Sequence, residues 1–403
     1  MFPNAENHEE TVVDSERIRR MQTALGEAQL DALVLRLPEN IVMSFGVWPM
    51  NGFSYAIFTA EGGPVALIAP SCEDEEMDGC WAGKPRFFDW PRLSMGDPVE
   101  AIGKELKDVV NRHHLSRAKI GYEGSFECVA PAHNSGEAMV PCESSITWLK
   151  SLVPKAKWRD ATGFLHGQRA TKTPAEIGQL RLTHRVAGYG LKKFMDSIVP
   201  GTTEAQAAAL VYGECLTKGA KIREVKHLNV YPQISSGPNA HRAWRPVVTT
   251  GSRRMRSEEM SVLELAVCVN GFWADVTRVK AVGRPTALQK EIFAAVKSAG
   301  QAAVKAIRPG VEARVPHEAA AGVFVEAGLE KYMVHLTGHG LGFRYHEPEP
   351  FLMPGNKQQL GIGHVCSVEP GLYDPAFGGI RLEENIAVAA GGAELLSTAP
   401  RRL

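Results

Sequence analysis

Apolar residues recur at helical and at strand-like spacings along the chain, in an order that divides it into two regions. In the first region a helix is predicted over 15–29 and a strand over 31–35. A hairpin follows, with strands over 53–59 and 65–69 on either side of a Gly-Gly-Pro turn. Helical and strand-like segments continue to about residue 160, which predicts an α/β domain.

The second region has longer helical patterns that come in pairs, and each pair precedes a strand-rich stretch. The four helices are predicted over 175–197, 204–217, 287–307 and 318–327. This recurrence of helices followed by hairpins predicts an internally duplicated α+β domain. A polar stretch over 160–172 separates the two regions, and we place the boundary between residues 163 and 164.

Composition and charge limit the classes to which this protein can belong. A chain of 403 residues exceeds what one hydrophobic core usually supports, so two domains, 1–163 and 164–403, are expected. Lys and Arg together number 45, as do Asp and Glu, which argues against binding to nucleic acid or to an anionic membrane surface. No apolar stretch approaches the roughly 20 residues that span a bilayer. The first ten residues lack a secretory pattern and the seven cysteines are scattered, so a cytoplasmic location is expected.

The segment 261–279 carries the first candidate chemistry. Two β-rich runs flank Asn270-Gly271, a strong hairpin signal, and because 270 + 271 = 541, position i should pair with position 541 − i. Glu264 then lies opposite Thr277, with Asp275 as its diagonal neighbour on the same face. Two carboxylates placed in this way suit a pair of metal ions about 3.5–4 Å apart. The alternative is an ordinary strand whose acidic residues face water.

A glycine-rich segment supplies the second candidate. His339 stands between Gly338 and Gly340, and glycines allow a close approach of backbone and ligand to the imidazole. His335 and His346 lie in the same segment, and three histidines within twelve residues favour a functional site. The glycine spacing does not match a dinucleotide-binding fingerprint.

Two further carboxylates follow in β-rich surroundings. Glu369 comes at the end of an apolar run, and Glu383 lies inside another one after Gly378-Gly379. A carboxylate inside an apolar strand is costly to bury unless it is paired or bound to a metal. Four carboxylates and one neutral imidazole would balance two divalent cations, and these ligands suit manganese, iron(II), cobalt or zinc.

These motifs, in this order, resemble the creatinase / aminopeptidase P / prolidase family, whose pita-bread fold is shared with methionine aminopeptidase. The resemblance also covers Pro38-Glu-Asn-Ile41, the stretch from Arg169 to Glu176 and Pro309-Gly310. It implies an α/β N-terminal creatinase/prolidase-like domain over 1–163 and a C-terminal α+β pita-bread catalytic domain, a duplicated αββ unit, over 164–403. It also implies a homodimer.

The resemblance assigns roles to particular side chains. The metal ligands of the family, Asp, Asp, His, Glu and Glu, fall on Glu264, Asp275, His339, Glu369 and Glu383. Two divalent ions would make hydroxide available from water near neutral pH. Glu369 would accept the water proton and pass it to the leaving nitrogen, while His346 would hydrogen-bond the tetrahedral intermediate. Arg381 would orient Glu383 from behind or form a structural ion pair.

Two positions depart from the family pattern. Glu264 replaces the first Asp and is one methylene longer. The family usually carries a substrate-contacting histidine eight residues after the serine of Ser-Gly-x-Asn; counted from Ser236 this position is Trp244. His241 lies three residues earlier, and we consider both His241 and Trp244 candidate substrate contacts.

The sequence leaves several functions open. The leading hypothesis is a metal-dependent hydrolase of peptide C–N bonds, of the Xaa-Pro aminopeptidase or dipeptidase type. The second is a C–N hydrolase or lyase that acts on a small metabolite, as creatinase and ectoine hydrolase do; Trp244 and Glu264 favour it. The third is a catalytically silent binding protein of the same fold. A hydrolase that uses Cys366 as its nucleophile is a remote fourth.

Overall fold

The computed structural model describes residues 12–50, 53–75, 77–91, 96–124, 143–245, 250–397 and 399–403. The described chain divides into two compact units, and it passes from the first to the second between Leu165 and His166. This point lies inside helix α5 (Thr162–Ala170). We call residues up to 165 unit 1 and those from 166 onward unit 2.

Unit 1 is built on one mixed six-stranded sheet. The strands lie in the order β4 (Arg86–Phe88), β3 (Gly63–Pro70), β2 (Tyr55–Thr59), β1 (Ala32–Leu35), β5 (Lys119–Tyr122) and β6 (Lys157–Asp160). The β1–β2 and β2–β3 pairs are antiparallel and the other pairs are parallel. The helices of this unit are α1 (Ser15–Glu27), α2 (Pro38–Phe45), α3 (Pro98–Arg112) and α4 (Glu143–Leu152). The predicted α/β organisation and the β2–β3 hairpin are confirmed.

Unit 2 repeats a pair of helices followed by strands. Helices α6 (Pro174–Ser197) and α7 (Glu204–Gly219) precede the antiparallel sheet of β7 (Leu228–Ser236), β8 (Met260–Val269) and β9 (Phe272–Ala281). Helices α8 (Ala287–Ala306) and α9 (Arg314–Glu326) precede a second set of strands. These strands are β10 (Gly338–Gly340), β11 (Glu347–Leu352), β12 (Val365–Val368), β13 (Gly371–Asp374), β14 (Gly378–Arg381), β15 (Glu384–Ala389) and β16 (Gly392–Leu395).

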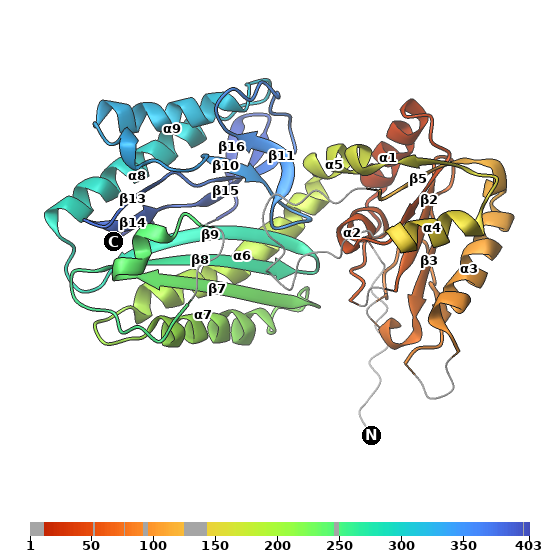
Figure 1. The fold of residues 1–403 in the computed structure, drawn as a ribbon, viewed down its shortest axis with the longest axis horizontal. Coiled ribbons are helices and arrows are strands. Elements are labelled where there is room, and N and C mark those ends of the chain that lie inside the picture. Colours follow the sequence, from red (N-terminus) through yellow and green to blue (C-terminus); the bar gives the residue numbers. More distant parts are fainter. Residues whose placement is uncertain are drawn as a thin grey trace. The chain divides into compact units, whose positions relative to one another are not determined.

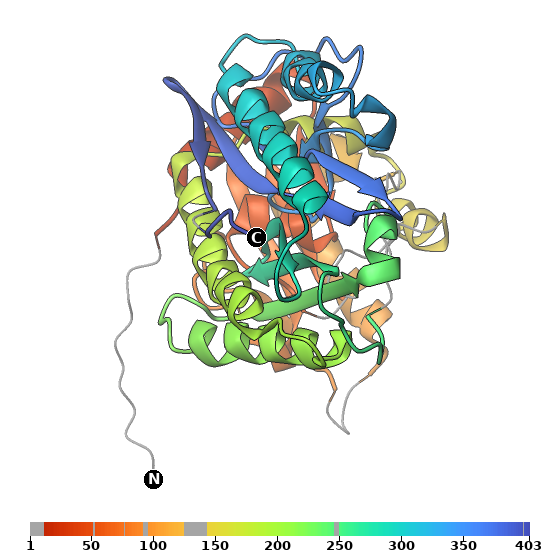
Figure 2. The same cartoon turned by 90° about the vertical axis from the view of Figure 1, so that its left-hand side faces the viewer.

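The two helix pairs lie on the outside of unit 2 and the strands lie between them (Figure 1). In the turned view the cyan helix α8 and the green helix α7 are again on opposite sides of the strands (Figure 2). This arrangement is the duplicated α+β layering that the sequence predicts.

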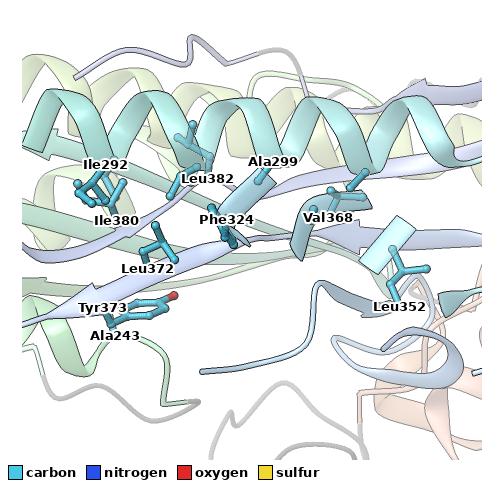
Figure 3. Close-up of a cluster of buried hydrophobic side chains, with 14 of the residues drawn as sticks. Ala243, Ile292, Ala299, Phe324, Leu352, Val368, Leu372, Tyr373, Ile380 and Leu382 are labelled. Atoms are coloured by element: carbon cyan, nitrogen blue, oxygen red, sulfur yellow. The ribbon is translucent and has the colours of Figure 1, made fainter. Parts of the chain in front are cut away.

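Two apolar cores stabilise unit 2, one under each helix pair. Helices α6 and α7 bury side chains such as Phe194 and Val211 against Leu263 and Leu265 of β8. On the other side, Ile292 of α8 and Phe324 of α9 pack on the strands that follow them, among them β12, β13 and β14 (Figure 3). Side chains of a strand alternate between its two faces, so Glu264, which lies between Leu263 and Leu265 in β8, points away from the α6–α7 core.

Several helix ends differ from the predicted limits by a few residues, and α1 and α9 are two examples. Helix α1 ends at Glu27, because Gln29 takes a left-handed conformation with φ of 54°. Helix α9 begins at Arg314, four residues before the predicted start at 318. Pro316 lies within its first turn, where the missing amide hydrogen costs nothing.

Candidate metal centre

The hairpin of β8 and β9 presents Glu264 and Asp275 on one face. Asn270 and Gly271 both have positive φ, at 52° and 86°, as a type I′ turn requires. The resulting register pairs Glu264 with Thr277 and Ala266 with Asp275, and the predicted 541 − i pairing is confirmed. Because Leu263 and Leu265 fill the α6–α7 core, Glu264 faces the opposite way.

His339 lies in the middle of β10, which runs between β11 and β12. A Cβ atom on Gly338 would stand 2.0 Å from the carbonyl oxygen of Ser367, and one on Gly340 would stand 1.9 Å from that of Glu349. The two glycines are therefore needed for the close approach of neighbouring strands. The sequence predicts that these glycines allow backbone and ligand to come close, and the structure shows that the backbone of β11 and β12 does so.

The remaining two carboxylates belong to residues next to the ends of strands. Glu369 follows β12 directly, and its amide donates to the carbonyl of Thr337. Glu383 lies in the two-residue link between β14 and β15, and its amide donates to the carbonyl of Thr277 on β9. These backbone hydrogen bonds fix both carboxylates relative to the strands that carry His339 and Asp275.

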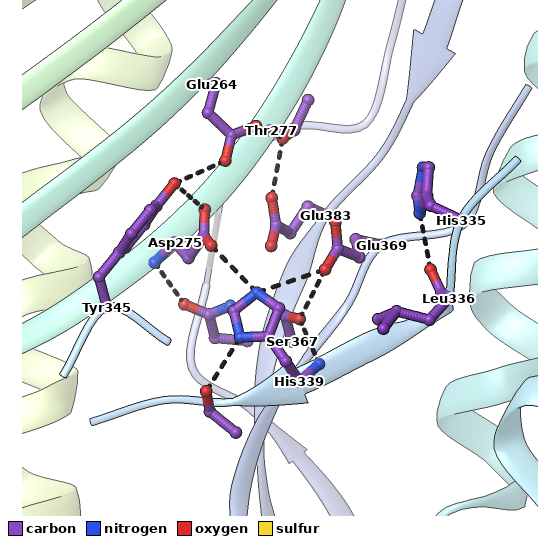
Figure 4. A network of polar contacts seen from close by, with 12 residues as sticks. Glu264, Asp275, Thr277, His335, Leu336, His339, Tyr345, Ser367, Glu369 and Glu383 are labelled. Atoms are coloured by element: carbon purple, nitrogen blue, oxygen red, sulfur yellow. Dashed lines mark hydrogen bonds and ion pairs between the residues drawn. The ribbon is translucent and has the colours of Figure 1, made fainter. Parts of the chain in front are cut away.

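The structure brings all five predicted ligands into one buried cluster (Figure 4). The Nε2 atom of His339 lies 3.4 Å from Asp275 Oδ2 and 3.4 Å from Glu369 Oε1. Two overlapping groups could each hold a cation: His339 with Glu369 and Glu383, and Glu264 with Asp275 and Glu383. A third such group joins Asp275, His339 and His346.

Burial dominates the electrostatics of this cluster. It raises the pKa of Glu369 to about 7, and it raises the pKa values of Asp275 and Glu383 well above their usual range. The other carboxylates of the cluster raise these last two further, since like charges in a site of low dielectric constant repel each other. Burial also lowers the pKa of His339 to about 4, so its ring is neutral at pH 7.

The donor set fits a divalent cation. His339 Nδ1 lies 2.9 Å from the carbonyl oxygen of Gly340, which can only accept, so Nδ1 carries the ring proton. The lone pair of Nε2 then faces an oxygen of Asp275 and an oxygen of Glu369. A separation of 3.4 Å is what two ligands of a tetrahedral ion have when each bond is about 2.1 Å long. Glu383 Oε1 is buried and has no hydrogen-bond partner within the described part of the chain.

Glu264 is held by three residues, of which Tyr345 was not singled out in the sequence. Its Oε1 accepts a hydrogen bond from Tyr345 at 2.8 Å and its Oε2 accepts one from Thr277 at 2.7 Å. The guanidinium of Arg381 forms an ion pair with the same Oε2. Arg381 was expected either to orient Glu383 or to form a structural ion pair. The structure shows an ion pair with Glu264, and a hydrogen-bond chain through Thr277 also connects Arg381 to Glu383. In the sequence, Tyr345 is indicated by its place between His339 and His346.

A second set of residues orients the ligands from behind. Asn385 Oδ1 accepts from the amide of Asp275 at 2.9 Å and lies 2.7 Å from His184 Nε2. Ser367 accepts from the amide of His339 at 3.0 Å and donates to Glu369 Oε1 at 3.1 Å. Such partners restrict ligand orientation. No local sequence pattern marks Asn385 or Ser367, so neither could be predicted.

A cavity of about 180 Å³ opens onto the cluster. Its wall includes four of the predicted ligands, His346 and Arg381, and also Trp244 and Arg245. Trp244 is 40% exposed, and the guanidinium carbon of Arg245 lies 5.4 Å from its ring centroid. The His346 ring lies 4.3 Å from that of His339. His241 is half-buried and is not part of the wall.

Comparison with known proteins agrees with the fold and with the cluster. Residues 178–390 match the model of metallopeptidase family M24. The chain is 30% identical over 388 residues to an Xaa-Pro dipeptidase of Pyrococcus furiosus, which covers 96% of this chain and 99% of that one. It is 31% identical over 239 residues to an Xaa-Pro dipeptidase of Lactobacillus helveticus, and this match spans 62% of the relative's length. The crystal structure of the prolidase from Pyrococcus horikoshii OT3 superimposes with a TM-score of 0.75 at 23% identity, over 96% of this chain and all of that one.

The duplicated layers of unit 2 and the carboxylate–histidine cluster between them define a protein of the pita-bread class. Within that class, the chain belongs to metallopeptidase family M24, and the resemblance to the creatinase / aminopeptidase P / prolidase group is confirmed. Among the described helices, none combines the length and the apolar character needed to cross a membrane.

Proposed function

We propose that this protein is a metal-dependent hydrolase that cleaves the peptide bond of Xaa-Pro substrates. The observation that carries the proposal is the lone pair of His339 Nε2, which faces Asp275 Oδ2 and Glu369 Oε1 at 3.4 Å. This lone pair and the two carboxylate oxygens together form a set of donors that a divalent cation could bind. The Xaa-Pro dipeptidases among the relatives support the choice of substrate.

The proposed cofactor is a pair of divalent ions held by Glu264, Asp275, His339, Glu369 and Glu383. Oxygen donors with one imidazole suit manganese, cobalt, iron or zinc. A pair of ions held by these residues would supply polarisation of the scissile carbonyl and would lower the pKa of water toward neutrality.

Side chains of the cavity supply the remaining steps. Glu369 would accept the proton of the attacking water and return it to the leaving nitrogen. His346 lies beside His339 on the cavity wall and donates a hydrogen bond to the developing oxyanion. Trp244 forms an apolar wall for the substrate. A cytoplasmic homodimer is part of the same proposal.

The test combines metal analysis with a substrate panel. The protein is purified without chelator, its bound metal is quantified, and hydrolysis of Ala-Pro and Leu-Pro is compared with hydrolysis of creatine and ectoine. We expect close to two ions per chain and turnover of the dipeptides. Asp275→Asn should lose bound metal, and Glu369→Gln should reduce kcat by about 10²–10⁴-fold.

One observation favours a second candidate, a C–N hydrolase of a small non-peptide metabolite. Trp244 stands on the cavity wall where the family usually has a histidine, and a flat apolar surface suits a compact ring better than it suits a peptide carbonyl. Turnover of ectoine or creatine without turnover of dipeptides would establish this candidate in place of the first. Absence of metal after incubation with Mn²⁺ or Zn²⁺ would contradict the metal-dependent mechanism itself.

A further inference from the structure

Strand β7 has one face toward the cavity and the other toward helix α7. Ser235 lines the cavity, whereas Ile234 packs into the α6–α7 core. Because side chains of a strand alternate between its two faces, Ser236 points toward α7 as Ile234 does. The last residue of β7 is therefore in a position to bind groups of α7 while its neighbour in sequence faces the substrate cavity.

The chain that leaves β7 forms part of the cavity wall. It turns at Gly237, where φ is 51°, and passes through the 3₁₀ helix η3 (Gly237–Arg242). Three consecutive residues that line the cavity follow, namely Ala243, Trp244 and Arg245. We call residues 236–245 the wall segment. The Trp244 side chain is exposed, so its position depends on the backbone that carries it.

One buried carboxylate holds the start of the wall segment and a residue beyond its end. Glu204, in the first turn of α7, is fully buried. Its Oε1 accepts from the amide and from the hydroxyl of Ser236, each at 2.8 Å, and its Oε2 accepts from the amide of Gly251 at 3.0 Å. The backbone of Glu204 and Ala205 also donates to the carbonyl oxygens of Arg253 and Gly251. Both chain stretches are therefore fixed to the same end of α7.

Arg253 supports the same anchor. Its Nη1 donates to Ser236 Oγ at 2.9 Å, and an ion pair with Glu259 holds its guanidinium. A Cβ atom on Gly237 would stand 2.6 Å from Arg253 Nη2, so the guanidinium packs directly against the turn. Glu204, Arg253 and Glu259 all lie outside the cluster of predicted metal ligands, and they hold the turn from the side of β7 that faces α7.

We propose that Glu204 is a positioning residue for substrate binding, which sets the place of Trp244 on the cavity wall by holding Ser236 and Gly251. The inference rests on the hydrolytic function proposed above. Glu204 is not part of the cavity wall, so it acts through the wall segment and not on the reacting atoms. Its loss should raise KM and leave kcat and the bound metal nearly unchanged, because an apolar wall binds ground state and transition state alike.

Glu204→Gln tests the proposal in a double-mutant cycle with Trp244→Ala. Glutamine keeps the length of the side chain but has one acceptor oxygen, so it cannot accept from both Ser236 and Gly251. Steady-state kinetics of the full-length protein are measured with whichever substrate of the panel the wild-type protein hydrolyses, together with the metal content. We expect Glu204→Gln to raise KM roughly three- to tenfold in the wild-type background. It should raise KM little further in Trp244→Ala, because two residues that act through one wall are not independent.

Glu176→Gln is the matched control. Glu176 is a buried carboxylate in the first turn of the neighbouring helix α6, where it accepts from the amide of Thr173 at 2.8 Å, and it is not part of the cavity wall. We expect this substitution to leave KM unchanged. Hydrogen exchange of peptides that cover 234–245 gives a readout without substrate, and it should be faster in Glu204→Gln than in the wild-type protein and in Glu176→Gln.

Ser236→Ala is a milder variant, which removes one of the three hydrogen bonds to Glu204 and replaces Glu204→Gln in every measurement if the latter does not fold. It should give the same change in KM with a smaller amplitude. An unchanged KM, a fall in kcat with loss of metal, or full effects of both substitutions in the double variant overturns the proposal and leaves the hydrolytic function standing. A wild-type protein that hydrolyses no substrate of the panel overturns both.

Discussion

The contact between Glu264 and Arg381 is the residue-scale feature that most distinguishes this site. The additional methylene of Glu264 carries its carboxylate to the guanidinium of Arg381, which is otherwise fixed by hydrogen bonds to Ala243 and Thr277. Burial lowers the pKa of Arg381. The guanidinium nevertheless stays charged at pH 7, because arginine loses its proton only in strongly basic solution. Its role is to neutralise a carboxylate that the family pattern assigns to a metal.

We expect Arg381→Ala to destabilise unit 2 strongly. The pair is largely buried, with side-chain exposures of 6% and 17%, and removing one partner of a buried pair costs about 3–5 kcal/mol. Urea unfolding of the metal-free protein measures this change. The control is Arg181→Ala in the exposed pair with Glu394, which should cost less than about 1 kcal/mol. Equal effects of the two substitutions would contradict the assigned role of Arg381.

Trp244 gives a second prediction at this scale. If its ring lines the substrate site, Trp244→Ala should raise KM about tenfold and change kcat little, because an apolar wall binds ground state and transition state alike. Steady-state kinetics with Leu-Pro measures both constants. A large fall in kcat at constant KM would instead mean that Trp244 acts on the reacting atoms.

At the scale of elements, the β8–β9 turn determines which side chains meet at the site. Gly271 has φ of 86°, a conformation that costs other residues about 1–2 kcal/mol, so Gly271→Ala should lower the unfolding free energy by that amount. Gly213→Ala is the matched control, because Gly213 lies in helix α7 with open space around it, where alanine is favoured. Chemical denaturation of both variants tests the difference, and a stable Gly271→Ala protein would contradict it.

Helix α2 of unit 1 gives a pH-dependent prediction. Its N-cap is Leu37, which makes no side-chain capping hydrogen bond. Glu123 holds the chain just before the helix by accepting from the amides of Arg36 and Leu37, and it also accepts from Asn40 Nδ2. Burial raises the pKa of Glu123 from 4.5 to about 7. The folded unit therefore binds this proton more tightly than the unfolded chain, so its stabilising effect is complete below pH 4.5 and disappears as the pH rises through 7.

The shift corresponds to about 3 kcal/mol over this pH range. Hydrogen exchange of the peptide 36–45, measured by mass spectrometry at several pH values and corrected for intrinsic rates, reports the local opening free energy. We expect this free energy to fall between pH 5 and pH 8 in the wild-type protein, with a shallower dependence in Glu123→Gln. The same slope in both proteins would exclude Glu123 as the titrating group.

At the scale of the whole molecule, metal binding should stabilise unit 2 selectively, since all five predicted ligands lie there. An ion present at a thousand times its dissociation constant stabilises the folded state by about 4 kcal/mol. Calorimetry with Mn²⁺ and with a chelator should therefore show the transition of unit 2 moving to lower temperature on chelation while that of unit 1 stays in place. A shift of the unit 1 transition alone would contradict the assignment of the ligands.

The turns, the strand register and the helices of unit 2 could be predicted from the sequence, because the residues that determine each of them are close together along the chain. Asn270-Gly271 requires a type I′ turn, this turn sets the register, and the register puts Glu264 opposite Thr277. The helices of unit 2 could be placed because their apolar spacing extends over many turns, and capping boxes start three of them. The order of the acidic residues and His339 along the chain was enough to indicate a resemblance and a metal site.

Only the tertiary structure decided which partners these residues have. Tyr345 is 81 positions from Glu264 in sequence, Arg381 is 117 positions from it, and Asn385 is 110 positions from Asp275, so no spacing rule connects them. Their meeting depends on how β10, β14 and β15 are layered against β8 and β9, which the packing of two separate apolar cores determines. The sequence therefore determined that carboxylates and an imidazole would be buried together, because each strand carries its own pattern. The fold determined which of them hydrogen-bond to a phenol and which pair with a guanidinium, because these partners lie on different strands that come together only through packing.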